Sequence, residues 1–281
     1  MSNKIDELRE LAESDLVAFI ALVAPYIQLG DIHIELITWL TRDDRKDNQL
    51  VLLPRGHLKS KLAAYLVAWL ITRNPEETIL YVSSTAALAE VQLYQIKQVL
   101  ESDAYRMLWP TMIHEDEGKR ERWTVSEISV DHPKRKEEGI RDFTVKAIGI
   151  TGSTTGFHAS VVVLDDLVTP NNAYTQDGRD KVASMYSQLA SIENPGAREV
   201  IFGTRYHPKD LYNDVILMKE AVLDDFDEEM SQGEVYEVFQ RVVETNGNFL
   251  WPRMQRPDGK AFGYDAKILA RIKAKYIDYT Q

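Results

Sequence analysis

The sequence predicts an α/β protein with a doubly wound, mainly parallel sheet, flanking helices and a small lid. Short apolar runs of about five residues alternate with longer segments whose apolar residues recur at helical spacing. Several of these runs end in polar or small residues, as strands do at the sheet edge where ligands bind. Because a helix connects one run to the next, neighbouring strands should be parallel.

The first segment, residues 1–48, should form helices that pack on the sheet. Apolar residues recur at helical spacing over residues 4–24, where Pro25 ends the pattern and Ser14-Asp15 can divide it into two helices. A second helical pattern covers residues 31–41.

The second segment, residues 49–208, should form the core. Strands are predicted at 49–53, 78–83, 143–148, 160–164 and 199–202, and helices at 58–72, 86–100 and 174–192. Residues 102–140 are charged and mixed in pattern, so we expect loops around an irregular sheet there, and residues 149–156 are expected to form a loop.

The third segment, residues 209–281, should form a lid or linker. It reads as a helix, an acidic stretch, a strand over 235–243 and a final helix from Asp265.

Composition excludes several classes of protein. The 281 residues include 44% hydrophobic and 27% charged ones, as in a soluble globular chain and unlike a disordered or fibrous one. The absence of cysteine excludes disulfides and cysteine zinc sites and fits a reducing compartment. No apolar run is long enough to span a bilayer, and the polar start lacks the apolar stretch of a signal peptide.

The net charge of −11 would normally argue against a nucleic-acid partner. Residues 220–237, however, contain eight acidic side chains and no Lys or Arg. The charge is therefore uneven, and a local basic surface is compatible with it.

The turn after the first predicted strand, Pro54–Ser60, could hold a phosphate. Amides at a helix start favour an anion, Lys59 adds a positive charge, and the Ser60 hydroxyl could hold Mg²⁺. The strict Gly-x-x-x-x-Gly-Lys-Ser/Thr pattern fails, because Leu53 and Leu58 occupy its glycine positions. The alternative is an ordinary strand–helix turn with an incidental Lys-Ser.

A later apolar strand, residues 161–164, delivers two carboxylates, Asp165 and Asp166, to the same sheet edge. One carboxylate can reach Mg²⁺ and its neighbour can orient an attacking water. An exposed Asp-Asp turn is the alternative, but its occurrence together with the Pro54–Ser60 turn favours nucleotide hydrolysis.

These motifs and several others resemble the large subunits of tailed-bacteriophage terminases, in the order in which that family carries them. The loop Pro54-Arg55-Gly56-His57-Leu58-Lys59-Ser60 resembles the family's deviant phosphate-binding loop, which carries an arginine before the lysine. The resemblance also includes Ile79–Ser84, Thr155–Ala159, Val163–Asp166, Ile201–Pro208 and Leu250-Trp251-Pro252.

The resemblance implies a P-loop NTPase of the RecA-like (ASCE) class that hydrolyses ATP, with Mg²⁺, to move double-stranded DNA into a procapsid. It also implies a portal, a small terminase subunit and a homo-oligomeric ring, a pentamer when docked, as partners. The isolated chain could be a monomer, and the protein would work in the host cytoplasm without a membrane.

The resemblance assigns roles to individual residues. Lys59 would bind the β- and γ-phosphates, Ser60 and Asp165 would hold the metal, and Asp166 would be the catalytic carboxylate, where the family usually has Glu. Arg55 would contact the phosphates and report their state; its alternative is a surface arginine paired with an acid. The coupling motif would be Gly203, Thr204 and Arg205. His33 falls near the adenine-contacting segment, although a histidine at that place on an apolar helix is more often structural.

The expected DNA contacts are basic residues of the 102–140 region. A solvated charged loop is the alternative, since acidic residues lie among them. The candidates are Lys119, Arg120, Arg122, Lys134, Arg135 and Lys136.

The family's second domain is a nuclease, which this chain is expected to stop short of, near residues 273–281. The acidic stretch is read as a solvated face, because nuclease metal ligands come from separate strands. No nuclease activity is therefore expected. Two alternatives to a packaging ATPase remain open: a helicase-like P-loop ATPase that acts on nucleic acid without a portal, and a non-enzymatic scaffold that has lost the loop glycines.

Overall fold

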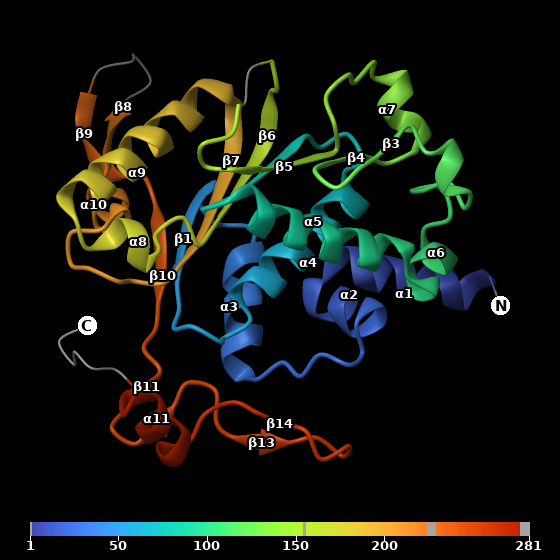
Figure 1. Cartoon of the computed structure of the whole chain (residues 1–281). Coiled ribbons are helices and arrows are strands. Elements are labelled where there is room, and N and C mark those ends of the chain that lie inside the picture. Colours follow the sequence, from blue (N-terminus) through green and yellow to red (C-terminus); the bar gives the residue numbers. More distant parts are fainter. Residues whose placement is uncertain (1, 154–155, 224–228, 276–281) are drawn as a thin grey trace.

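The computed structural model describes residues 2–153, 156–223 and 229–275, and an eight-stranded sheet forms its centre (Figure 1). The strand order is β10-β1-β7-β6-β2-β5-β4-β3, with every pair parallel except those that involve the short strands β3 and β4. The predicted α/β class and mainly parallel sheet are confirmed. The strands are β1 (Asn48–Leu52), β2 (Ile79–Ser83), β3 (Arg122–Trp123), β4 (Glu127–Ser129), β5 (Val145–Gly149), β6 (Ala159–Asp165), β7 (Glu193–Gly203) and β10 (Glu237–Gln240).

Strand β7 lies between β1 and β6, and this order determines which loops meet. Ile201 of β7 is in register with Leu50 on one side and with Leu164 on the other. The three strands therefore end at the same edge. The loop after β1, the acidic pair after β6 and Thr204 after β7 come together there.

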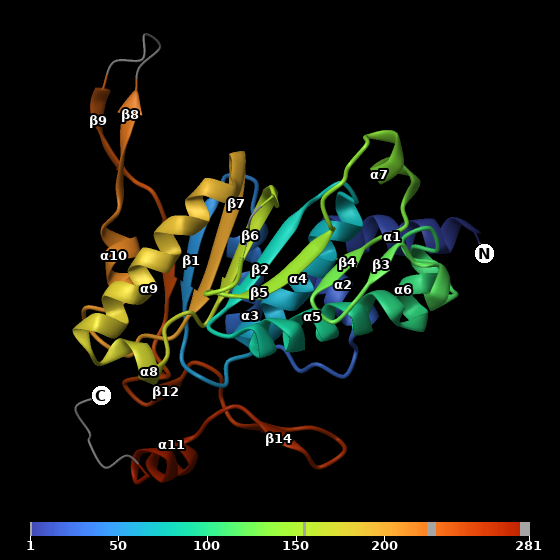
Figure 2. The same cartoon turned by 45° about the horizontal axis from the view of Figure 1, so that its top comes forward.

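Helices cover both faces of the sheet (Figure 2). One apolar cluster joins the sheet to α1, α2, α3, α4 and α5, with α4 (Lys59–Arg73) almost entirely buried at its centre. A second apolar cluster joins the other face to α8, α9 and α10. Burial of apolar side chains on both faces explains why the strands read as continuous hydrophobic runs.

The N-terminal helices agree with the sequence prediction, including the break near residue 15. Helix α1 (Ser2–Ser14) ends there, and the Asp15 carboxylate caps α2 (Leu16–Val23) by accepting a hydrogen bond from the Val17 N–H. Helix α3 covers Asp31–Thr41.

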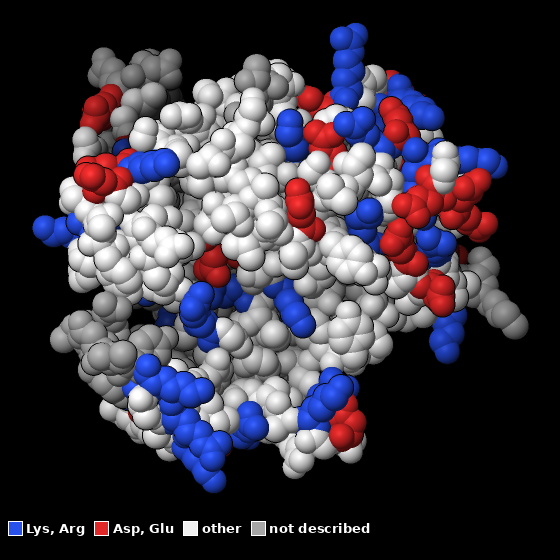
Figure 3. All heavy atoms as spheres, viewed as in Figure 1, with Lys and Arg blue, Asp and Glu red and all other residues white. Residues whose placement is uncertain are grey.

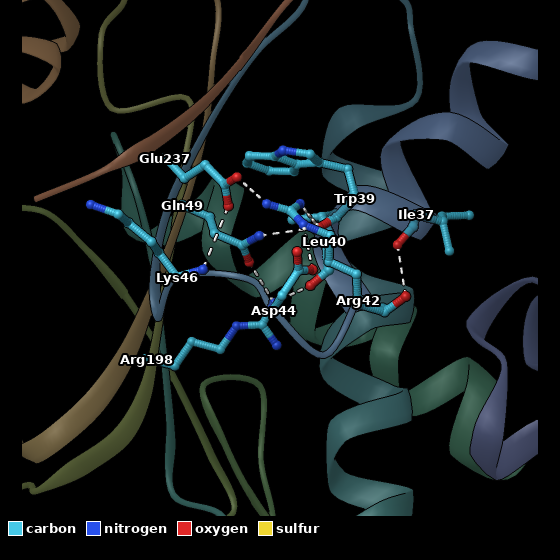
Figure 4. Close-up of polar contacts among 10 residues, drawn as sticks. Ile37, Trp39, Leu40, Arg42, Asp44, Lys46, Gln49, Arg198 and Glu237 are labelled. Atoms are coloured by element: carbon cyan, nitrogen blue, oxygen red, sulfur yellow. Dashed lines mark hydrogen bonds and ion pairs between the residues drawn. The ribbon is translucent and has the colours of Figure 1, made fainter. Parts of the chain in front are cut away.

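Polar contacts hold α3 against the sheet (Figure 4). The Gln49 side chain on β1 donates to the Trp39 carbonyl at 3.3 Å and accepts from Arg198 of β7 at 2.7 Å. Arg42 forms an ion pair with Glu237 on β10. Since these residues belong to three adjacent strands, the contacts fix the N-terminal helices relative to the loop after β1.

The region 102–140 contains more helix than predicted. After α5 (Ala86–Glu101), the Ser102 hydroxyl accepts from the Tyr105 N–H and starts α6 (Asp103–Leu108). The short helices η1 (Glu117–Lys119) and α7 (Pro133–Glu137) follow around β3 and β4. The helix predicted at 174–192 is α9 (Gln176–Leu189), preceded by α8 (Pro170–Ala173) and followed by η2 (Ala190–Ile192).

The sheet continues beyond Pro208, because β10 pairs in parallel with β1. The division of the chain at this residue stays a prediction. The segment contains α10 (Leu211–Leu217), the hairpin β8 (Lys219–Leu223) and β9 (Glu229–Glu234), the pairs β11 (Glu244–Thr245) with β12 (Asn248–Phe249) and β13 (Met254–Gln255) with β14 (Ala261–Phe262), and α11 (Ala266–Lys273).

Three predictions fall partly on residues outside the described ranges. These are the centre of the acidic stretch at 224–228, the end of the chain at 276–281, and Thr155 in the 149–156 loop. Across the described ranges, no helix combines the length and apolar character needed to cross a bilayer.

Candidate active site

The loop between β1 and α4 keeps a tight turn without the expected glycines. Gly56 has φ +77°, and Leu58, the residue before α4, has φ +57°. The left-handed conformation costs a non-glycine residue on the order of 1 kcal/mol. Leu58 therefore adopts the backbone conformation that a glycine would adopt more easily at this position of the strict motif.

Lys59 begins α4 and is buried beneath this loop. Its Nζ donates to the Thr204 hydroxyl at 2.8 Å and to the carbonyls of Leu53 and Pro54 at 3.2 and 3.3 Å. Burial lowers the pKa of Lys59 below its ordinary value. The ammonium thus donates to neutral oxygens at the mouth of the loop. An anion, whose oxygens are stronger acceptors, could take the place of these oxygens.

Asp165 is the last residue of β6 and is buried. Its Oδ1 accepts from the Ser60 hydroxyl at 2.9 Å, and its Oδ2 accepts from the Tyr81 hydroxyl on β2 at 3.1 Å. Burial, followed by the charge of Asp166, raises the pKa of Asp165 to about 7. Tyr81 is a site residue that the sequence analysis missed, because a tyrosine in an apolar strand looks like an ordinary core residue.

Asp166 lies next to Asp165 but has different surroundings. Its backbone has φ +48°, and its N–H donates to the Phe202 carbonyl at 2.9 Å. Its Oδ1 is buried and has no hydrogen-bond partner in the described part of the chain. Burial raises the pKa of Asp166 above its ordinary value. The two carboxylates therefore differ in their hydrogen-bond partners, so they can take different roles.

Ser60 and Asp165 offer the ligands that Mg²⁺ prefers. Both donors are oxygens, and they lie 2.9 Å apart at the loop. Over the described ranges, no group of three or more His, Cys, Asp or Glu could hold a metal ion by itself. A hydroxyl with one carboxylate fits an ion that also takes phosphate oxygens and water as ligands.

Arg55 is exposed on the loop, and its guanidinium lies over the Tyr206 ring, 5.6 Å from the ring centre. No ion pair joins Arg55 to an acidic residue among those that the structure describes. A paired surface arginine was the alternative for this residue, and the geometry does not favour it.

A cavity of about 770 Å³ opens beside the loop, in the size range of small-molecule sites. It combines apolar and aromatic walls with four basic side chains, and no acidic residue is among the described residues that line it. The lining residues that bear on function are Arg55, Arg205, Arg241, Lys273, Tyr174 and Tyr206.

The predicted coupling residues lie at the end of β7, beside the loop. Gly203 packs so closely on the Tyr212 ring that a Cβ atom would lie 2.3 Å from it. Arg205 forms a 3.1 Å ion pair with Asp210, which is fully buried and also accepts from the Tyr206 and His207 N–H groups. The turn after Thr204 is therefore rigidly held.

His33 is buried at the start of α3. Its Nδ1 accepts from the Gly30 N–H at 2.9 Å, and its ring packs edge-on against Trp251, with centres 4.6 Å apart. Burial lowers the pKa of His33 to about 4, so the ring is neutral near pH 7. His33 does not line the cavity, and the contact with adenine stays a prediction.

The C-terminal segment, residues 253–275, contacts the loop through Tyr264, a residue that the sequence analysis also missed. The Tyr264 hydroxyl donates to the Arg55 carbonyl at 2.9 Å, and its ring stacks in parallel on His57, with centres 4.9 Å apart. A Cβ on Gly56 would lie 2.1 Å from that hydroxyl. Residues more than two hundred positions apart in sequence therefore form the outer wall of the loop.

Two of the predicted DNA contacts are internal. The buried Arg135 guanidinium donates to the carbonyls of Pro75, Glu77 and Asp142. The buried Arg120 pairs with Glu101 at 2.6 Å and stacks on Trp123. Both side chains stabilise the fold, so we correct the prediction and remove them from the candidate contacts.

The other four basic candidates lie on the surface, and three of them have acidic partners. Lys119 lies 3.8 Å from Asp116, Arg122 pairs with Glu127 at 2.6 Å, and Lys134 pairs with Glu76. Lys136 is exposed. Helix α7 packs against the segment that enters β2, at the opposite sheet edge from the loop.

No family model matches this chain. It is 27% identical over 210 residues to the terminase large subunit of Enterobacteria phage T3. The matched residues cover 72% of this chain and 34% of that protein. This chain therefore spans about a third of that relative's length.

The likeness to solved structures concerns the fold alone. The large terminase of bacteriophage HK97 is 13% identical, with a TM-score of 0.50 over 73% of this chain and 40% of that one. This likeness supports the P-loop α/β fold. The large terminase ATPase domain of Thermus phage P74-26 is 14% identical, with a TM-score of 0.43 over 80% of this chain and 84% of that one.

Proposed function

We propose that this chain hydrolyses ATP and that it is the ATPase portion of a terminase large subunit that moves double-stranded DNA. The single observation that carries the ATPase proposal is the meeting of Lys59, Ser60, Asp165 and Asp166 at one sheet edge. The likeness to a terminase large subunit supports the link to DNA packaging.

The residues of the loop suit a triphosphate. Lys59 would exchange its neutral oxygen partners for the phosphates, and the amides before α4 would bind the same anion. Mg²⁺, held by Ser60 and Asp165, would supply charge neutralisation at the phosphates. The cavity beside the loop, about 770 Å³, would take the rest of the nucleotide.

Asp166 would position the attacking water. Its buried Oδ1 has no protein partner in the described ranges, so it can accept a hydrogen bond from a water. Arg55 would donate to phosphate oxygens, because an exposed guanidinium without an ion pair is free to turn toward an anion. Thr204 joins Lys59 to β7 and could transmit a change at the loop to the turn that follows.

A helicase-like ATPase that never meets a portal is the second candidate, since the site geometry would be the same. The non-enzymatic scaffold is less favoured, because Leu58 keeps the left-handed turn despite the lost glycine. A portal, a small terminase subunit, ring assembly and action in the host cytoplasm are proposals that follow from the terminase likeness.

Measured ATP turnover tests the proposal. The purified chain should release phosphate from ATP in Mg²⁺, and a Lys59→Ala variant should not. Stimulation of turnover by procapsids and DNA ends would favour a packaging motor, and stimulation by DNA alone would favour the helicase-like reading. A folded chain without turnover would refute the ATPase proposal.

We also expect no DNA cleavage by the chain, as the sequence analysis predicted. Incubation with supercoiled plasmid in Mg²⁺ or Mn²⁺ should leave the plasmid intact. Linearisation that co-purifies with the protein would contradict this expectation.

A further inference from the structure

We propose that the C-terminal segment, residues 253–275, binds the phosphate backbone of double-stranded DNA. The identity of the partner rests on the proposed function, but the location does not. The segment contains seven Lys and Arg and only two Asp, a net charge of +5 in a chain whose net charge is −11. Such a local excess of positive charge is typical of a surface that binds a polyanion.

Helix α11 presents its basic residues as a stripe. Lys267 and Arg271 are four residues apart on one side of α11, about 6 Å along its axis, and Lys275 follows in the turn after the helix ends at Lys273; these three residues are called the stripe. All three side chains are exposed. The apolar residues Leu269 and Ile272 line the cavity beside the loop, which turns the stripe away from the core.

The described residues do not neutralise the stripe. Within the described ranges, no ion pair joins Lys267, Arg271 or Lys275 to a carboxylate. Elsewhere in the segment, Arg256 pairs with Asp258 at 3.2 Å. The stripe therefore differs from the earlier basic region, residues 102–140, where carboxylates or backbone carbonyls of the protein bind most of the basic side chains.

Other cations line the cavity on the side of α11 that faces the core. Figure 3 shows Lys and Arg side chains gathered around the hollow between the sheet core and the C-terminal segment. Arg55, Arg205 and Arg241 line the cavity from the core side and Lys273 lines it from α11, and none of its described lining residues is acidic. Cations on both sides of a hollow strengthen the positive potential in front of it.

The chemistry fits contact with phosphates rather than with bases. Lys and Arg stripes bind phosphates in any sequence, as a protein that moves DNA requires. The segment also contacts the nucleotide loop through Tyr264 and the Arg55 carbonyl. DNA bound to this segment would therefore be linked to the loop through the hydrogen bond between Tyr264 and the Arg55 carbonyl.

The salt dependence of DNA binding tests this location. The full chain is titrated into a fluorescent duplex of about 25 base pairs at several salt concentrations, and the slope of log affinity against log salt is measured. The test variant replaces Lys267, Arg271 and Lys275 with Gln. The matched control replaces Lys119, Arg122 and Lys136 with Gln, which removes the same charge from the earlier basic region.

The test variant should reduce the slope by about 3, since each phosphate contact contributes about 0.9, and should weaken binding at least about tenfold at low salt. The control should change the slope by less than about 1. An unchanged slope in the test variant, an equal reduction in the control, or no DNA binding by the native chain would overturn the proposal.

Affinity for a fluorescent ATP analogue, measured without DNA on the same proteins, separates this proposal from the ATPase proposal. The three stripe residues do not line the cavity, so nucleotide affinity should stay unchanged in the test variant. Failure of the native chain to bind the nucleotide would count against the proposed function, and the DNA slopes would still decide the location.

Discussion

Two buried carboxylates on adjacent strands have similar chemistry and different surroundings. Asp165 ends β6, and Glu199 lies within β7. Burial is the main cause of a raised pKa in both, to about 7 for Asp165 and about 8 for Glu199. Each accepts hydrogen bonds from two hydroxyl groups.

The difference lies in what surrounds those hydroxyls. Glu199 is enclosed by Tyr236 at 2.6 Å and Tyr186 at 3.2 Å, whose hydroxyls also contact each other. Both also have a carboxylate neighbour, Glu193 for Glu199 and Asp166 for Asp165, but Asp166 has an oxygen without a partner in the described ranges, and Lys59 lies near Asp165 at the sheet edge. A raised pKa therefore does not by itself identify a site. Unsatisfied polar atoms at the strand ends do so better.

The largest effect should come from the unpartnered carboxylate. Asp166→Asn should reduce turnover by about a thousandfold, because the amide cannot accept the proton of the attacking water. Nucleotide affinity should stay near that of the native chain, since Lys59 and the loop are intact. Phosphate release and binding of a fluorescent ATP analogue measure the two. Normal turnover in Asp166→Asn together with lost turnover in Asp165→Asn would reverse the assigned roles.

Arg55→Ala should reduce turnover by about a hundredfold at saturating ATP, because a guanidinium near the phosphates can stabilise the transition state. Arg55→Lys should recover little, since lysine cannot make the two-pronged contact. Steady-state kinetics decide this, with circular dichroism to show that both variants fold. A near-normal kcat in Arg55→Ala would remove Arg55 from the site.

Glu199→Gln should affect stability and leave turnover within about twofold. The raised pKa of Glu199 means that the folded chain keeps a proton that the unfolded chain releases, so native stability falls as pH rises from about 4.5 to about 8. The glutamine variant lacks this loss. It should gain on the order of 4 kcal/mol relative to the native chain between pH 5 and pH 8.5, because each pKa unit corresponds to about 1.4 kcal/mol.

Urea unfolding at the two pH values measures the change. If the unfolding free energies of the native chain and the Glu199→Gln variant differed by the same amount at pH 5 and pH 8.5, the raised pKa of Glu199 would be contradicted. A large loss of turnover would show that Glu199 belongs to the site, and would remove the contrast with Asp165.

The smallest effect should come from Tyr81→Phe, which removes one donor from Asp165. Loss of one hydrogen bond to a charged group, about 1.5 kcal/mol, should raise the half-saturating Mg²⁺ concentration about tenfold. Binding of Mn²⁺ in the presence of ADP, measured by magnetic resonance, should weaken to the same extent. Tyr105→Phe is the matched control, because its buried hydroxyl bonds to Thr72 at 2.9 Å, far from the carboxylates. Equal metal affinity in the two variants would contradict a role for Tyr81.

The sequence alone determined the elements that depend on local pattern. Apolar runs predicted β1, β2, β6 and the buried end of β7, because strands buried on both faces must be apolar there, but the polar first half of β7 (Glu193–Gly203) was not predicted. The order of strands and helices predicted parallel pairing, and parallel strands bring their carboxyl ends to one edge. The loop before Lys59 and the acidic pair could therefore be assigned to one place without any coordinates.

Tertiary structure decided every feature that depends on a distant neighbour. Tyr81 reaches Asp165 across 84 positions in sequence, and Tyr264 reaches the Arg55 carbonyl across 209. Arg135 also depends on distant neighbours. Its basic sequence surroundings indicated a surface residue, but the side chain is buried and donates to backbone carbonyls. A side chain's chemistry is encoded locally, but its partners and its exposure depend on which elements pack against it, and no local pattern contains that information.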